Sequence, residues 1–214
     1  RKSLLPLYLF KALLTGKPMQ VGYFYRRHIH RQINEIIQRY QPDHIYCQLI
    51  RMAEYVREVN VAKTLDYMDC FSAGMARQGR EGKKWLAPIY RREAHLLTDY
   101  QLEVYPDFDH HTIISEQDRT LLDPTGKLDI RVVPNGIDTD FFKPRPFPAP
   151  KADIAFVGNM GYFPNIKAAQ YLIEKIMPLV WEKKPQAKVI ISGARPHPSI
   201  KAFAKDARIE VTGW

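Results

Sequence analysis

The chain has 214 residues, of which 45% are hydrophobic and 26% charged, and a formal net charge of +9. This composition is typical of a soluble globular protein with one large or two small domains. No apolar run reaches the roughly 20 residues that span a bilayer, and residues 4–10 lack the cleavage site of a secretory signal. Two cysteines are too few for a disulfide framework and favour a cytoplasmic location.

Positive charge is concentrated at the beginning of the chain. Residues 1–34 contain seven Lys and Arg and no Asp or Glu. Such a segment attracts phosphate groups, and the leucines interleaved with it favour an anionic membrane surface over nucleic acid. The alternative is a solvated basic face without a partner. We therefore predict peripheral membrane contact through residues 1–34 and no nucleic-acid partner.

Helices and strands alternate along the first half. Residues 1–15 read as a basic amphipathic helix that ends before Pro18, because a residue before proline avoids helical dihedrals. A second helix is predicted over residues 23–40, with an apolar stripe of Ile29, Ile33, Ile36 and Ile37. There follow a buried strand (44–49), a short helix (51–58), a second strand (61–66), a polar and flexible stretch (78–84) and a long helix (85–105). After a third strand (111–115), Ser115 caps a helix through Leu122, with Asp118 in a capping-box position.

A connector separates the two halves. A short strand over residues 130–133 leads into Pro134, Asn135 and Gly136, which predict a tight turn because Asn-Gly readily takes positive φ. Asp138 follows, and four prolines within residues 144–150 indicate a stiff, extended segment. These features predict a first domain over residues 1–134, a Pro-rich interdomain linker over 135–150, and part of a second domain over 151–214.

The second half has a β-α-β-α-β pattern. The strands are predicted at residues 153–158, 188–193 and 209–213, and the helices at 164–181 and 200–205. Strands joined by helices form a parallel sheet. Because the chain opens in a helix and stops at Trp214, directly after a strand, we expect a fragment of a longer protein.

Glycines end all three strands of the second half, at Gly158, Gly193 and Gly213. Ligands of parallel sheets bind at the carboxyl ends of the strands, where glycine allows the backbone to approach a phosphate. The three glycines therefore favour nucleotide or phosphate binding. The spacing G-x-G-x-x-G is absent, which disfavours an NAD site.

Several of these segments carry a family resemblance. They are Val133-Pro134-Asn135-Gly136-Ile137-Asp138, Phe156-Val157-Gly158-Asn159-Met160, Pro164-Asn165-Ile166-Lys167, Ser192-Gly193-Ala194-Arg195-Pro196 and Val211-Thr212-Gly213. Through these segments the chain resembles glycosyltransferase family 4, whose members are retaining GT-B enzymes, and within it the bacterial exopolysaccharide sugar transferases. Residues 65–69 and 113–115 resemble the acceptor-side domain more weakly.

The resemblance implies an α/β fold of GT-B type, with two Rossmann-like parallel-sheet domains that face a cleft and are both incomplete in this chain. It implies transfer of a hexose from a nucleotide-diphosphate sugar to a glycan or lipid-linked acceptor, with retention, in surface polysaccharide biosynthesis. The donor is a substrate, and no cofactor or metal is expected. The implied donor-binding residues are Gly158, Asn159, Asn165, Gly193, Ala194, Arg195 and Gly213. Pro134, Asn135, Gly136 and Asp138 form the implied hinge.

The chain departs from the family pattern at two places. Members often carry an Arg and a Lys-Gly pair where this chain has Asn159 and Pro164-Asn165, and Arg195 or Lys167 could supply the missing positive charge. The family's paired glutamates are expected downstream of Trp214, so we expect no turnover by these 214 residues. The alternatives are a non-catalytic nucleotide-sugar-binding protein and a nucleotide-sugar epimerase of the same fold.

Other residues allow more than one interpretation. Asp66 and Asp69, at the end of a strand, could bind the acceptor, act as a base or cap a helix. His28 with His30, and His110 with His111, lack further ligands at metal-binding spacing and favour structural or surface roles. Cys47 lies in a strand and is predicted to be a buried core residue.

Overall fold

The computed structural model describes residues 16–143 and 151–213. The chain divides into two compact units, residues 1–138 and 139–214, which are treated separately below. The division falls within residues 135–150, the segment predicted as a linker. The helix predicted over residues 1–15 and the prolines of residues 144–150 lie outside the described residues.

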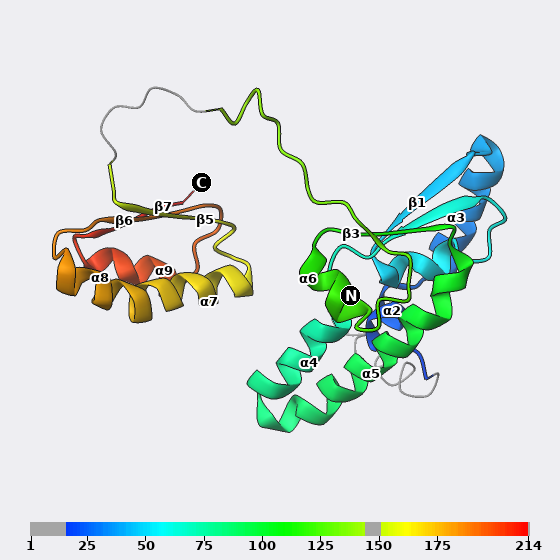
Figure 1. Ribbon diagram of the computed structural model, residues 1–214, viewed down its shortest axis with the longest axis horizontal. Helices are drawn as coiled ribbons and strands as arrows, with labels where there is room; N and C mark the ends of the chain where they lie inside the picture. Colours follow the sequence, from blue (N-terminus) through cyan, green and yellow to red (C-terminus); the bar gives the residue numbers. More distant parts are fainter. Residues whose placement is uncertain (1–15, 144–150, 214) are drawn as a thin grey trace. The chain divides into compact units, whose positions relative to one another are not determined.

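The first unit is built on a four-stranded parallel sheet in the order β1-β2-β3-β4 (Figure 1). Each strand pairs with the next one along the chain, as α/β crossovers favour. The strands are β1 (His44–Gln48), β2 (Ala62–Asp66), β3 (His110–Ile113) and β4 (Arg131–Val132). The parallel α/β fold class predicted from the sequence is therefore confirmed.

Helices and 3-10 turns connect these strands and enclose a core that includes Leu65, Tyr67, Val104 and Ile113. In chain order they are α2 (Met19–Phe24), α3 (Arg27–Tyr40), η2 (Ile50–Tyr55), α4 (Phe71–Glu81), η3 (Lys84–Leu86), α5 (Ala87–Val104), η4 (Tyr105–Asp107) and α6 (Glu116–Leu122). The cap predicted for α6 is present, because Ser115 Oγ accepts a hydrogen bond from the Asp118 amide at 3.1 Å. Figure 1 shows α4 and α5 side by side as a hairpin that extends away from the sheet.

The helix predicted over residues 23–40 is interrupted. The backbone is extended at Tyr25 and Arg26, and α3 starts only at Arg27. The cause is distant in sequence: Tyr55 donates its hydroxyl to the Phe24 carbonyl at 2.7 Å and accepts from the Arg26 amide at 2.9 Å. These tertiary hydrogen bonds replace the helical ones. Within the predicted stripe, Ile29, Ile33 and Ile37 pack on the core, whereas Ile36 is exposed.

Two further expectations for this unit were wrong. The strand predicted as buried is the edge strand β1, where only Cys47 is buried, because β1 has a neighbour on one side only. Residues 78–81 of the predicted flexible stretch form the last turn of α4. They are held because Gly79 is buried against α5: a Cβ at this position would lie 3.2 Å from Arg91 Cγ.

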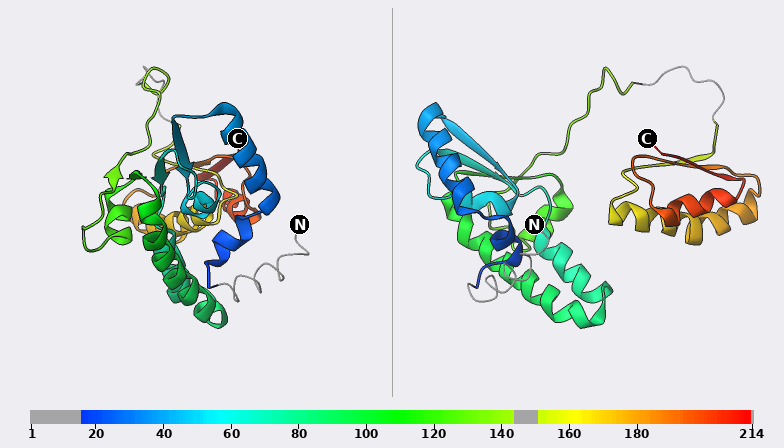
Figure 2. Two further views of the ribbon diagram at one scale, coloured as in Figure 1. Left: turned by 90° about the vertical axis from the view of Figure 1, so that its right-hand side faces the viewer. Right: turned by 180° about the vertical axis from the view of Figure 1, so that it is seen from behind.

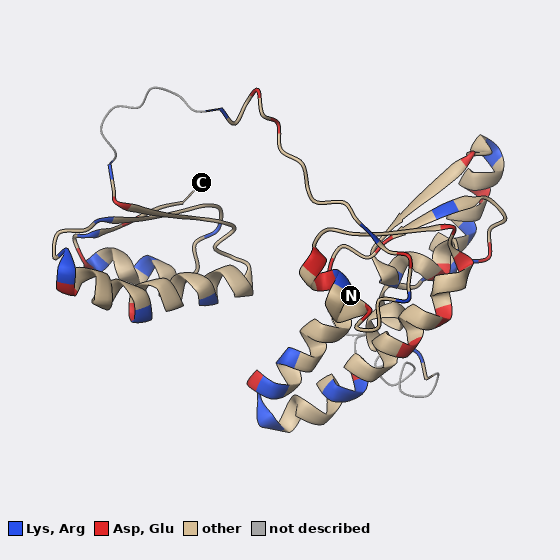
Figure 3. Ribbon diagram, viewed as in Figure 1, with Lys and Arg blue, Asp and Glu red and all other residues tan. Residues whose placement is uncertain are grey.

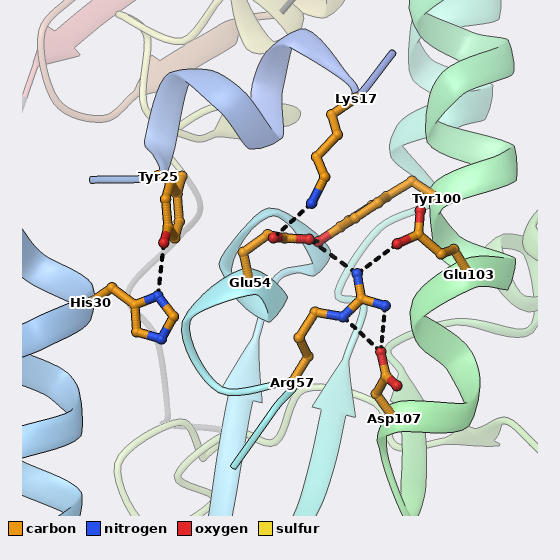
Figure 4. Close-up of polar contacts among 8 residues, drawn as sticks. All are labelled: Lys17, Tyr25, His30, Glu54, Arg57, Tyr100, Glu103 and Asp107. Atoms are coloured by element: carbon orange, nitrogen blue, oxygen red, sulfur yellow. Dashed lines mark hydrogen bonds and ion pairs between the residues drawn. The ribbon is translucent and has the colours of Figure 1, made fainter. Parts of the chain in front are cut away.

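A polar network ties η2 to α5 (Figure 4). Glu54 accepts hydrogen bonds from Lys17 at 2.8 Å, from Tyr100 at 3.0 Å and from Arg57 at 3.1 Å. Arg57 also contacts Glu103 and Asp107, each at 2.7 Å. Burial acts to raise the pKa of Glu54, but these donors together outweigh it and hold that pKa below its ordinary value.

The second unit is a three-stranded parallel sheet in the order β5-β6-β7. The strands are β5 (Ile154–Val157), β6 (Val189–Ser192) and β7 (Ile209–Gly213). The helical elements are α7 (Phe163–Tyr171), η5 (Leu172–Ile176), α8 (Met177–Lys183), α9 (Pro198–Lys201) and η6 (Ala202–Lys205). They cover one face of the sheet (Figures 1 and 2), and the core between them includes Met160, Met177, Val189 and Ile191.

A π-turn interrupts the helix predicted over residues 164–181. It spans η5 and ends two residues before Pro178, the second residue of α8. A proline inside an α-helix has no N–H to donate, and its ring collides with the carbonyl four residues earlier, which a wider turn avoids. Ile173, within the π-turn, and Met177, after it, both remain buried against the sheet.

The tight turn predicted at Pro134, Asn135 and Gly136 is not formed. Neither Asn135 nor Gly136 has positive φ, and residues 133–138 have no regular structure; the turn lies at residues 139–141 instead. Tight Asn-Gly turns are stabilised by antiparallel pairing of the strands that flank them. Here the chain leaves the parallel strand β4 without pairing back.

Among the helices that the structure describes, none is both long enough and apolar enough to cross a membrane.

Candidate functional site

Three glycines meet at the carboxyl edge of the second sheet. The Gly158 amide donates to the Ser192 carbonyl at 3.0 Å, and the Gly193 amide donates to the Gly213 carbonyl at 2.9 Å. A Cβ at Gly193 would lie 1.7 Å from the Gly158 carbonyl oxygen, so only glycine fits there. The three predicted positions thus form one continuous backbone surface, which we call the glycine edge.

The loop after β5 is held by two asparagines. Asn159 Oδ1 accepts from the Gly161 amide at 3.0 Å, and Asn165 Nδ2 donates to the Asn159 carbonyl at 3.1 Å. A Cβ at Gly158 would lie 2.9 Å from Asn165 Nδ2. Asn159 and Asn165 therefore lie beside the glycine edge, and these contacts fix the loop that leads into α7.

The loop after β6 contributes an exposed cation. The Ala194 carbonyl accepts from the Met160 amide at 2.8 Å, which ties this loop to the one after β5. Arg195 has the left-handed φ of +55°, and its Cβ lies 3.1 Å from where a Cβ on Gly161 would be. Within the described part of the chain its guanidinium has no ion-pair partner.

The two candidate replacement cations differ in their surroundings. The Lys167 ammonium lies over the ring of Phe163, 5.7 Å from its centroid, in a cation–π contact. The side chain of Arg195 is not engaged in this way. Arg195 is therefore the better placed of the two to bind an anion at the glycine edge.

The α7 N-terminus adds a second source of positive potential. No side chain caps it, and Pro164 removes one of its amide donors. The free amides of a helix N-terminus and the helix dipole favour phosphate groups. The glycine edge, Arg195 and this terminus together could hold the phosphates of a nucleotide.

At the corresponding edge of the first sheet, the two predicted aspartates differ. Asp66 is buried and accepts from the Tyr46 hydroxyl at 2.7 Å and from the Met68 amide at 3.2 Å. Asp69 is exposed, and its carboxylate has no hydrogen-bond partner among the described residues. Partial desolvation of its carboxylate, followed by the negative charges of Asp118 and Asp66, raises the pKa of Asp69 above its ordinary value.

Neither aspartate caps a helix, which corrects one of the sequence-based alternatives. The N-cap of α4 is Cys70, which makes no side-chain cap, while α6 is capped by Ser115. Asp66 instead positions the chain after β2, where Met68 takes a left-handed φ of +62°. Asp69 remains the carboxylate available to a ligand.

Arg51 is a candidate functional residue that the sequence analysis did not identify. It follows β1, and its guanidinium lies between two rings, 4.5 Å from the centroid of Phe24 and 5.0 Å from that of Phe71. Burial lowers its pKa from the ordinary value for arginine. No signal in the sequence could have found this stack, because its three members come from separate segments.

His30, His110 and His111 take structural positions, whereas His28 is exposed. His30 Nδ1 is hydrogen-bonded to the Tyr25 hydroxyl at 2.8 Å, and His111 is buried and stacks on Tyr105 with centroids 4.0 Å apart. His110 stacks on His44. In the described ranges, 16–143 and 151–213, no group of three or more His, Cys, Asp or Glu side chains could hold a metal ion. Cys47 is buried, as predicted.

Comparison with known proteins links the glycine edge to a family. Residues 151–214, which contain all the predicted donor-binding residues, match the family described as glycosyl transferases group 1. The chain is similar to the crystal structure of TarM, which has the GT-B fold, with a TM-score of 0.53 and 14% sequence identity. The match covers 85% of this chain and 35% of TarM. The chain has no match among the curated proteins.

At this identity the similarity to TarM establishes the fold. The chain has the GT-B type of architecture, with Rossmann-like parallel sheets in both units.

Proposed function

We propose that the chain is part of a retaining glycosyltransferase of family 4, which transfers a hexose from a nucleotide-diphosphate sugar to a glycan or lipid-linked acceptor. The observation that carries the proposal is the glycine edge, because it lies wholly within the residues that match glycosyl transferases group 1. The role in surface polysaccharide biosynthesis, of exopolysaccharide type, rests on the motif resemblance.

In this proposal the donor diphosphate lies against Gly158, Gly193 and Gly213. Gly213 leaves its strand end open, with nothing within 4 Å of where a Cβ would lie, and Gly193 cannot carry a side chain at all. The uncapped amides of α7 donate to phosphate oxygens. Arg195 supplies charge-assisted hydrogen bonds, in place of the Arg and Lys that family members often carry at positions 159 and 164.

Asp69 is the proposed acceptor-side group. A carboxylate accepts hydrogen bonds from sugar hydroxyls, and a raised pKa also suits a group that takes up a proton. Asp66 acts through the backbone, because its bonds to Tyr46 and the Met68 amide hold the segment from which Asp69 projects.

We place the enzyme in the cytoplasm, with its donor as a substrate and no cofactor. Contact with an anionic membrane through residues 1–34 would bring it to a lipid-linked acceptor; residues 1–15 of this segment lie outside the described part of the chain. Nucleic acid is not a proposed partner.

The direct test is calorimetric titration of the chain with UDP, GDP and ADP. We expect one of these nucleoside diphosphates to bind, and Arg195→Ala to weaken its binding roughly 10-fold or more, since hydrogen bonds to charged groups contribute about 1.5–3 kcal/mol. Lys183→Ala is the matched control, because it removes an exposed cation at the end of α8. Absence of binding, or equal losses in the two variants, would refute the assignment.

A non-catalytic nucleotide-sugar-binding protein is the second candidate, favoured by Asn159 and Pro164 in place of the family's cations. The protein would then bind nucleotide sugars without transfer to any acceptor. An epimerase would convert the sugar of the donor when incubated with donor alone, and chromatography of the released sugar distinguishes the three outcomes.

A further inference from the structure

The end of the α4–α5 hairpin carries positive charge that the proposed function does not use. We call residues 77–91 the hairpin tip; they contain five cations and a single carboxylate, Glu81. The cations are exposed and, within the described residues, form no ion pairs: Arg77, Arg80, Lys83, Lys84 and Arg91. Figure 3 shows Lys and Arg gathered where the hairpin turns.

Exposed apolar side chains accompany this charge. Trp85 is 72% exposed, more than any other described tryptophan, and Ile89 is 46% exposed. Trp85 lies in η3 and Ile89 in the first turn of α5, which continues η3, so the two side chains are spaced to share one face of the turn. Large side chains left in water at a projecting turn suggest a surface that is covered in use.

A cavity at the hairpin tip brings three of the cations together. It has a volume of about 370 Å³ and is lined by Arg80, Lys84 and Arg91, with Gly79, Gly82, Ala87 and Pro88. Arg80 belongs to α4 and Arg91 to α5, so the two helices of the hairpin contribute to it together. Three converging cations suit a phosphate group.

We infer that the hairpin tip docks on the surface of an anionic phospholipid bilayer. A headgroup phosphate occupies the cavity of Arg80, Lys84 and Arg91, while Trp85 and Ile89 enter the interfacial region. Tryptophan is enriched at membrane interfaces because its ring is apolar and its N–H polar, and each nearby Lys or Arg adds electrostatic attraction. The hairpin tip shares no residue with the segment 1–34, and the inference does not depend on sugar transfer.

A bilayer accounts for the tip better than nucleic acid does. Proteins that bind single strands present several aromatic rings along a basic groove, on which successive bases stack. The tip instead has one exposed tryptophan with an isoleucine at the end of a helical hairpin. Burial of an isoleucine side chain in hydrocarbon is favourable, whereas stacked bases give it no such apolar environment.

The test is co-sedimentation of the full chain with vesicles of phosphatidylglycerol and phosphatidylcholine, and with vesicles of phosphatidylcholine alone. Lys83→Ala/Lys84→Ala should weaken binding to the anionic vesicles about 30-fold, from roughly 1 kcal/mol for each lysine near the surface. Lys183→Ala/Lys184→Ala removes the same charge from an exposed Lys-Lys pair in the second unit and should change binding little. Far-UV circular dichroism checks that each variant is folded.

Fluorescence tests the tryptophan separately. In a variant with Trp181→Phe and Trp214→Phe, emission reports Trp85 alone and should shift to shorter wavelength on anionic vesicles only. Equal binding to neutral vesicles, equal losses in the two lysine pairs, or no shift would overturn the inference. The inference would also be overturned if Lys2→Ala/Lys11→Ala abolished vesicle binding while Lys83→Ala/Lys84→Ala kept it. Binding of the full chain to RNA oligonucleotides and not to vesicles would overturn it as well.

Discussion

Alanine at Gly193 should be far more damaging than alanine at Gly213, although both glycines end neighbouring strands with positive φ. Gly193 has φ +144°, and its Cβ would lie 1.7 Å from the Gly158 carbonyl oxygen and 2.7 Å from the carbonyl carbon. Gly213 has φ +73°, with nothing within 4 Å of the added atom. Comparison of the two alanine variants therefore separates the cost of a steric clash from the cost of an unfavourable backbone conformation.

The size of the difference follows from these contacts. A carbon and an oxygen approach to about 3.3 Å at closest, so the ends of β5 and β6 would have to separate by about 1.5 Å. That movement breaks the hydrogen bond from the Gly158 amide to the Ser192 carbonyl, at a cost of about 1–3 kcal/mol. Backbone strain in a residue with a Cβ at this φ adds about 1–3 kcal/mol. We therefore expect Gly193→Ala to lower the free energy of unfolding by roughly 2–6 kcal/mol, and Gly213→Ala to lower it by about 1–2 kcal/mol.

Urea unfolding of the full chain measures both losses. Trp181 reports the second unit, because its indole N–H donates to the Ala187 carbonyl at 2.8 Å; Trp85→Phe and Trp214→Phe remove the other emitters. Far-UV circular dichroism should follow the same transition. If the two alanine variants unfold at the same urea concentration, the close approach of β5 and β6 at the glycine edge is wrong.

Three further predictions concern single side chains. Burial raises the pKa of Cys47 to about 12, so a thiol reagent at pH 8 should label it only after unfolding; labelling of native protein would contradict its burial. Arg57→Lys should destabilise the first unit by about 1–3 kcal/mol, because an ammonium cannot keep the forked contacts, whereas Arg119→Lys, at an exposed pair, should change the midpoint of chemical unfolding little. A hydrogen bond from Arg208 lowers the pKa of Asp206 to about 2; this carboxylate stabilises the fold above pH 4 and loses that effect as the pH falls to 2. Thermal melts of Asp206→Asn should therefore change less over that interval than those of the unaltered chain, and parallel curves would refute the assignment.

The sequence predicted the glycine edge because its signals are local. Gly158, Gly193 and Gly213 each stop an apolar strand, and parallel pairing alone brings their ends to one edge. The same holds for the cap of α6, where Ser115 and Asp118 lie three residues apart.

Features set by contacts between distant residues were not predictable. The break at Tyr25 depends on Tyr55, and the position of Arg51 depends on Phe24 and Phe71. The exposure of β1 follows from its place at the edge of the sheet, and the pattern of apolar residues in the sequence does not reveal the order of the strands. The prediction of a tight turn at Asn135-Gly136 was wrong for a related reason. The local preference of Asn-Gly for a turn is not enough where the flanking residues do not pair as strands.

The π-turn between α7 and α8 determines where the second unit can gain or lose a residue. Each residue of an α-helix turns the side chains that follow by about 100°, so an insertion or deletion elsewhere in α7 or α8 would rotate Met177 or Val180 away from the sheet. A π-turn is one residue longer than an α-turn, so a deletion within Leu172–Ile176 can return the turn to ordinary α-helix and leave both apolar faces in phase. Length variation among homologues of this helix should therefore concentrate in a single turn.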